Sequence, residues 1–146
     1  MKLCMIGTGY VGLVSGTCFS DLGNDVICVD HDKKKVENLK KGVVPIYEPG
    51  LDELVLKNYK NKKLQFSTDL KGSILKSDII FICVGTPSKK NGKGADLTQV
   101  FNVAKEIRSS ISKFKIIITK STVPVTTGDE IEKIISQKIA KKFFSV

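Results

Sequence analysis

The chain has 146 residues and a net charge of +9, and 41% of its residues are hydrophobic while 27% are charged. This size and composition are typical of one globular domain that buries its own core. They exclude a membrane-spanning segment, because no run approaches the roughly 18 apolar residues that such a span needs. The first apolar run stops at Gly7, too early for a signal-peptide core, so we expect a cytoplasmic protein without a membrane partner.

Short apolar runs alternate with helical periodicity along the chain. In chain order we expect a strand over 2–6, a helix whose apolar positions run from 11 to 22, a strand over 26–29, helices over 32–41 and 51–59, and a strand over 64–67. A short helix ending at 76, a strand over 78–84, a helix over 97–111, a strand over 115–119, a helix over 127–140 and the start of a strand over 143–146 follow. This alternation predicts an α/β fold, a doubly wound parallel sheet of the Rossmann type.

The four cysteines, Cys4, Cys18, Cys28 and Cys83, form no CxxC pair and no metal-like spacing with the single histidine, His31. Three of them lie in expected strands. Cys18 recurs at helical spacing with other apolar residues of the first helix, so we expect it on the core face of that helix. The pattern indicates buried, reduced thiols and no metal site.

A glycine-rich segment with the pattern Gly-x-Gly-x-x-Gly lies between the first expected strand and the first expected helix. Gly7 would permit a tight turn, Gly9 would let the backbone approach a pyrophosphate, and Gly12 would let the helix pack closely on the strand. Free N–H groups at the start of the helix would then face the phosphates. The segment supplies the expected dinucleotide contacts Gly7, Thr8, Gly9, Tyr10, Val11 and Gly12.

Asp30 follows the second expected strand, where a carboxylate of a dinucleotide-binding fold accepts hydrogen bonds from the adenosine ribose. Its charge would repel a 2′-phosphate, so the sequence predicts NAD rather than NADP. Lys35 lies a few residues further on and would weaken that preference. A structural glycine turn with a solvated Asp30 is the alternative.

Polar loops follow the fourth and fifth expected strands. Ligands of open α/β sheets bind beyond the carboxyl ends of the strands, so we expect Gly85 and Thr86 beside the cofactor. We expect the hydroxyls of the segment 120–124, which contains Thr122, to point to the same crevice. The alternatives are an ordinary strand-to-loop turn and a Ser/Thr cap of the following helix.

The positive charge raises the possibility of a nucleic acid partner. The basic residues, nearly all lysine, are scattered in short clusters, and no aromatic residues interleave with them. We therefore expect a solvated surface and no nucleic acid partner. A non-enzymatic basic module that binds nucleotides or nucleic acid on a Rossmann scaffold stays open as an alternative.

Six segments together resemble the UDP-glucose 6-dehydrogenase family, within the wider UDP-glucose/GDP-mannose dehydrogenases. They are Gly7–Leu13, Val29-Asp30, Pro45–Leu51, Val84–Pro87, Ala95–Leu97 and Lys120–Pro124. The resemblance implies oxidation of the C6 hydroxyl of UDP-glucose to a carboxylate with two NAD per sugar. A related enzyme acting on GDP-mannose or a UDP-N-acetyl sugar is the alternative.

The resemblance also assigns roles to single residues. The positions of Val11, Asp30, Lys35, Thr86 and Thr122 match family positions that contact NAD. Thr122 also matches a residue near the reacting centre, where its hydroxyl would play a supporting catalytic role by positioning water or substrate. The family implies a UDP-sugar as the small-molecule partner and a homodimer for the full-length protein.

The chain departs from the family pattern in two ways. Thr126-Thr127 stands where the family usually has Gly-Thr, which puts a β-branched residue at a helix start. The family's nucleophilic cysteine and its other substrate residues have no counterpart within residues 1–146. We therefore expect one NAD-binding domain of a longer protein, without the central helix and substrate domain, that is inactive by itself.

Overall fold

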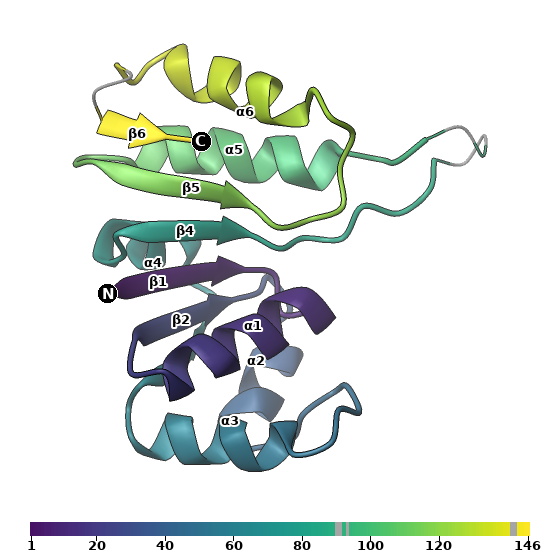
Figure 1. Cartoon of the computed structure of the whole chain (residues 1–146), viewed down its shortest axis with the longest axis vertical. Coiled ribbons are helices and arrows are strands. Elements are labelled where there is room, and N and C mark those ends of the chain that lie inside the picture. Colours follow the sequence, from purple (N-terminus) through teal and green to yellow (C-terminus); the bar gives the residue numbers. More distant parts are fainter. Residues whose placement is uncertain (90–91, 93, 141–142) are drawn as a thin grey trace.

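A six-stranded parallel sheet forms the centre of the computed structural model, which describes residues 1–89, 92, 94–140 and 143–146. The strands are β1 (Lys2–Ile6), β2 (Asp25–Val29), β3 (Leu64–Ser67), β4 (Ile79–Ile82), β5 (Lys115–Thr119) and β6 (Phe144–Ser145). Their order is β3-β2-β1-β4-β5-β6, with every neighbouring pair parallel, and the arrowheads of the strands labelled in Figure 1 point to one edge of the sheet. The predicted doubly wound fold is confirmed.

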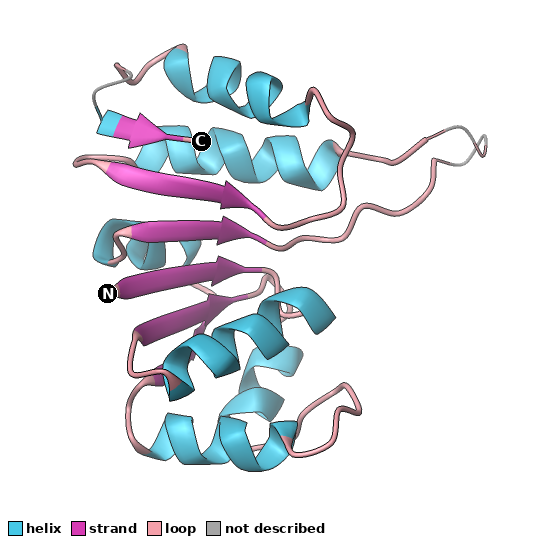
Figure 2. Ribbon diagram, viewed as in Figure 1, coloured by secondary structure: helices cyan, strands magenta, loops and turns pink. Residues whose placement is uncertain are grey.

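Helices cover the two faces of the sheet (Figure 2). They are α1 (Tyr10–Asp21), α2 (Lys33–Lys40), α3 (Leu51–Lys60), α4 (Leu70–Lys76), α5 (Thr98–Ser110) and α6 (Thr127–Ser136). Successive residues of a strand face opposite sides, and accordingly Leu3 and Met5 pack in one buried cluster with α1, α2 and α3. Cys4 and Ile6 pack in the other cluster, with α4, α5 and α6.

The contact of α1 with the sheet corrects one prediction. The buried face consists mostly of small residues: Gly12, Leu13, Gly16, Thr17 and Ser20. A Cβ on Gly12 would lie 1.8 Å from the Gly7 carbonyl oxygen, and one on Gly16 would lie 2.6 Å from Cys28 Sγ. Because the helix approaches the sheet through its glycines, the opposite face points outward. Cys18, which we expected on the core face, is exposed.

Element ends differ from the sequence prediction by a few residues. The fourth strand is shorter than 78–84 because Val84 already belongs to the loop above the sheet. The last helix ends at Ser136 rather than at 140, and a turn follows it. Asp32 and Asp69 cap α2 and α4, since their carboxylates accept from the N–H groups of Lys35 and Gly72. Within the described residues, no helix has the length and apolar character to cross a membrane.

Candidate dinucleotide site

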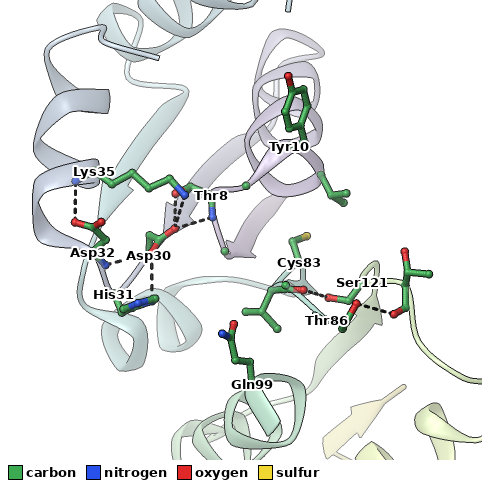
Figure 3. A pocket seen from close by; sticks show the side chains of 16 residues that line it. Thr8, Tyr10, Asp30, His31, Asp32, Lys35, Cys83, Thr86, Gln99 and Ser121 are labelled. Carbon is green, nitrogen blue, oxygen red and sulfur yellow. Dashed lines mark hydrogen bonds and ion pairs between the residues drawn. The ribbon is translucent and has the colours of Figure 1, made fainter. Parts of the chain in front are cut away.

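A groove lies at the carboxyl edge of the sheet, where the loops after β1, β2, β4 and β5 meet (Figure 3). Its larger cavity has a volume of about 450 Å³. All but one of the residues predicted from the sequence to contact the cofactor line this cavity. The predicted residues that line it are Gly7, Thr8, Gly9, Tyr10, Val11, Asp30, Lys35, Gly85, Thr86 and Thr122. The exception is Gly12, which is buried between α1 and the loop.

The three glycines of the loop after β1 differ in what requires them. Gly7 has a φ of +102°, and a Cβ on it would lie 2.7 Å from the Cys83 carbonyl oxygen. Gly12 is required by its contact with Gly7. Gly9 has an ordinary φ of −73°, and a Cβ there would meet no atom within 4 Å. The fold therefore requires glycine at the first and third positions, whereas the space beside Gly9 opens into the cavity.

Helix α1 begins next to that space. Gly9 is its N-cap residue, and no side chain caps the helix or places an acidic group in its first turn. Helix N-termini carry unsatisfied N–H groups and a partial positive charge. With no side chain at Gly9 to shield them, these groups form an anion site of the kind that binds phosphates.

Asp30 is the charged centre of the groove, with only 9% of its surface exposed. The N–H of Thr8 and its hydroxyl both donate to Oδ2, at 3.1 and 2.6 Å. Lys35 Nζ donates to the same oxygen at 3.1 Å, and the N–H of Asp32 donates to Oδ1 at 3.2 Å. Burial alone would raise the pKa of this carboxyl, but the hydrogen bonds from Thr8, Asp32 and Lys35 lower the pKa to about 2.

Two loops meet at the other end of the groove. The Thr86 hydroxyl donates to the Thr122 carbonyl oxygen at 2.9 Å, and the Ser121 hydroxyl donates to the Val84 carbonyl oxygen at 2.7 Å. The Ser121 hydroxyl therefore ties the β5 loop to the β4 loop. Thr122 is exposed, and its side chain lies in the lining of the cavity.

The alternative in which this segment caps the following helix is wrong. Helix α6 begins at Thr127, its N-cap residue is Thr126, and no side chain donates or accepts a capping bond there. Thr126 has a φ of −83° and a ψ of −1°, which any residue adopts. The β-branched residue at the position of the usual family glycine thus fits its backbone without strain.

A second cavity of about 440 Å³ adjoins the first and shares Asp30 and Val84 with it. Its walls are mainly apolar, with Val29, Leu70 and Val103 among them. Sequence reasoning missed this cavity, because its residues come from four separate elements. The available signal was the pair of amides on one face of the helix after the fourth strand, Gln99 and Asn102; Figure 3 shows Gln99 extending from α5 toward the groove.

The cysteines do not supply an activated thiol to the groove. Burial raises the pKa of Cys4 and of Cys83 to about 12, and it raises the pKa of Cys28 as well. Cys83 lines the larger cavity but is buried, whereas Cys18 is exposed and does not line it. Nucleophilic catalysis requires an accessible thiolate, which the three buried cysteines do not provide and Cys18 does not bring to the cavity.

Comparison with known proteins places this geometry among nucleotide-sugar dehydrogenases. The profile described as "UDP-glucose/GDP-mannose dehydrogenase family, NAD binding domain" matches residues 1–146. The chain is 54% identical over 137 residues to a UDP-glucose 6-dehydrogenase of Rhizobium meliloti, covering 94% of this chain and 31% of that protein. It is 52% identical over 144 residues to the UDP-glucose 6-dehydrogenase TuaD of Bacillus subtilis, covering 99% of this chain and 31% of that protein.

A solved structure has the same fold. The crystal structure of a ternary complex of GDP-mannose dehydrogenase from Pseudomonas aeruginosa superposes with a TM-score of 0.93 at 38% identity, covering 100% of this chain and 35% of that one. The chain thus spans about a third of the length of the curated relatives that it matches.

Proposed function

We propose that this chain, which belongs to the UDP-glucose/GDP-mannose dehydrogenase family and matches the NAD-binding domain of that family, holds NAD for a specific reaction. That reaction is the oxidation of UDP-glucose to UDP-glucuronate. Two relatives that are 54% and 52% identical carry the name UDP-glucose 6-dehydrogenase, which supports this substrate. Because the chain spans 31% of each relative, the complete reaction belongs to a longer protein.

The single observation that carries the proposal is the open space beside Gly9. Neither its φ nor any neighbouring atom of the chain requires glycine there. A group from outside the chain that must approach the backbone closely explains the missing side chain. A pyrophosphate against the uncapped N-terminus of α1 fits this space and the charge of the helix end.

The rest of the groove fits the two halves of a dinucleotide. The Asp30 carboxylate accepts hydrogen bonds from the ribose hydroxyls, and its charge disfavours a 2′-phosphate. The apolar cavity between α4 and α5 suits a flat base of the dinucleotide, because burial of the base in an apolar slot stabilises its binding. Bound NAD would supply the hydride acceptor for the two oxidations at C6 of the sugar.

The loops after β4 and β5 provide the reacting end of the groove. Thr86 holds the Thr122 backbone through its hydroxyl, and no described residue takes a hydrogen bond with the Thr122 hydroxyl. That hydroxyl is free to donate or accept, so we assign it a supporting role in positioning water or substrate. We do not assign it as the nucleophile, because a threonine hydroxyl acts as one only when a base activates it.

GDP-mannose is the second candidate substrate. It is favoured by the TM-score of 0.93 with a GDP-mannose dehydrogenase, although the identity of 38% is lower than that with the UDP-glucose enzymes. Four further points stay predictions: a UDP-N-acetyl sugar as an alternative substrate, a homodimeric longer protein, a cytoplasmic location and the absence of a nucleic acid partner.

The test is NADH formation by the longer protein that contains this sequence, with a panel of UDP-glucose, GDP-mannose and a UDP-N-acetyl sugar. We expect UDP-glucose to give the highest kcat/KM and Asp30→Ala to lower it mainly through the KM for NAD. The isolated chain should form no NADH with any of these sugars. A preference for another sugar would contradict the proposed substrate. NADH formation by the isolated chain would contradict the proposal that the nucleophile lies in a part of the longer protein outside residues 1–146.

A further inference from the structure

Thr8 is the one residue of the glycine-rich loop whose side chain is fully buried and polar. Its side chain points to Asp30 (Figure 3). The hydroxyl donates to Asp30 Oδ2 at 2.6 Å, and the Thr8 N–H donates to the same oxygen at 3.1 Å. Gly7 N also donates to the Val29 carbonyl oxygen at 2.8 Å. The loop that faces the phosphates and the end of β2 that carries Asp30 are therefore joined directly.

The two oxygens of Asp30 differ in the donors that they already receive. Oδ2 takes two donors from Thr8 and one from Lys35 Nζ, which exceeds the two lone pairs of a carboxylate oxygen. Oδ1 takes the N–H of Asp32, and the ring of His31 lies 3.3 Å away. The side chain of His31 is 95% exposed and can leave. Oδ1 is therefore the oxygen of Asp30 that can best accept a hydrogen bond from an incoming hydroxyl.

We propose that Thr8 is a positioning residue that acts through Asp30, by holding Oδ2 inward so that Oδ1 is presented to the ribose of the dinucleotide. This inference rests on the proposed binding of NAD. Thr8 is buried and bonded to the carboxylate through contacts within the chain alone, so the fold itself holds the acceptor in place. Such preorganisation raises affinity by lowering the entropy cost of association.

The charged groups around Asp30 give the inference a readout that needs no ligand. Lys35 faces it from α2, while His31 and Asp32 face it from the connection between β2 and α2. Burial raises the pKa of Asp30, and the Thr8 hydroxyl is the largest of the opposing contributions that bring the pKa down to about 2. Removal of this hydroxyl should return the pKa toward the ordinary value of 3.8.

The experiment compares Thr8→Val, which keeps the β-branched shape but loses the hydroxyl, with Thr8→Ser, which keeps the hydroxyl. Calorimetry measures the Kd of NAD and of NADP for each variant. A hydrogen bond to a charged group predicts that Thr8→Val weakens NAD binding about tenfold. Thr8→Ser should stay close to the wild-type chain. Binding of NADP should change little in both, so the ratio of the NADP Kd to the NAD Kd should fall in Thr8→Val alone.

A ¹³C NMR titration of the Asp30 carboxyl supplies the second measurement. Its pKa should rise in Thr8→Val and stay low in Thr8→Ser. An unchanged NAD affinity in Thr8→Val, an equal loss of NAD and NADP binding, or an unchanged Asp30 titration would each overturn the role of Thr8. A wild-type chain that binds neither dinucleotide would instead overturn the proposed NAD site together with this role.

Discussion

The two ends of the groove are built in different ways. At the ribose end, Asp30 is buried and bonded to the glycine-rich loop, to α2 and to the connection between β2 and α2. At the reacting end, the hydroxyls of Thr86 and Ser121 join two loops by bonds to backbone carbonyl oxygens, and Thr122 is exposed. No titratable group of lowered pKa lines the reacting end among the described residues. The described residues therefore concentrate their charged contacts at the ribose end of the groove.

The largest expected effect separates two glycines of the ribose end. In Gly12→Ala the new Cβ would lie 1.8 Å from the Gly7 carbonyl oxygen, so we expect a loss of about 3 kcal/mol or more in the free energy of unfolding. In Gly9→Ala the free energy of unfolding should change by less than about 1 kcal/mol, because no atom lies within 4 Å of the new Cβ. Urea unfolding measures both.

NAD affinity completes this pair. Gly9→Ala should keep its fold and lose affinity for NAD by at least about tenfold, because the methyl group would occupy the space assigned to the pyrophosphate. Normal NAD affinity in Gly9→Ala would remove the main support for the site. A stable Gly12→Ala would show that α1 can move away from the sheet without cost.

The second effect is the pH dependence of stability that Asp30 contributes. The pKa of Asp30 is about 2 in the folded chain, and the ordinary value of 3.8 stands for the unfolded chain. Because the folded pKa is lowered, this contribution is fully present above pH ~5 and is lost as the pH falls toward 2, with a total of about 2 kcal/mol. Asp30→Asn should lower the free energy of unfolding at neutral pH and flatten its acid limb between pH 5 and 2.

Asp78 provides the matched control for that titration. Its carboxylate is half exposed and pairs with Lys113 at the opposite edge of the sheet, away from the groove. Burial raises the pKa of Asp78 and hydrogen bonds from Lys113 and the Lys2 N–H lower it. Asp78→Asn should still flatten the acid limb much less than Asp30→Asn does, because exposed ion pairs contribute little. Equal flattening in both variants would contradict the special role of the network around Asp30.

The smallest effect is expected at the reacting end. Ser121→Ala removes the bond to the Val84 carbonyl oxygen, which predicts a loss of about 1 kcal/mol in the free energy of unfolding. NAD affinity should change by less than about threefold. A loss of NAD affinity as large as that of Gly9→Ala would show that the reacting end orders the cofactor as strongly as the ribose end does, and would break the comparison.

The sequence was sufficient for the features that depend on local order along the chain. The glycine spacing, the position of Asp30 after β2 and the polar loops after β4 and β5 all predicted residues that line the groove. Parallel strands place their carboxyl ends at one edge, so local order there determines spatial proximity.

The features that depend on packing could not be predicted. Helical periodicity shows that α1 is a helix but not which face lies on the sheet, and the close approach at Gly12 and Gly16 exposes Cys18. The strand β5 carries a fully buried lysine, Lys115, whose Nζ donates to the Leu75 and Ser77 carbonyl oxygens at the C-terminal end of α4. Neither contact leaves a pattern in the sequence around it.

The most direct test of the central claim is a calorimetric titration of NAD and NADP into the wild-type chain and into Asp30→Ala. The account predicts one NAD per wild-type chain, weaker binding of NADP, and a loss of at least about tenfold in NAD affinity in Asp30→Ala. Absence of NAD binding to the wild-type chain, or equal NAD affinity in the two proteins, would contradict it.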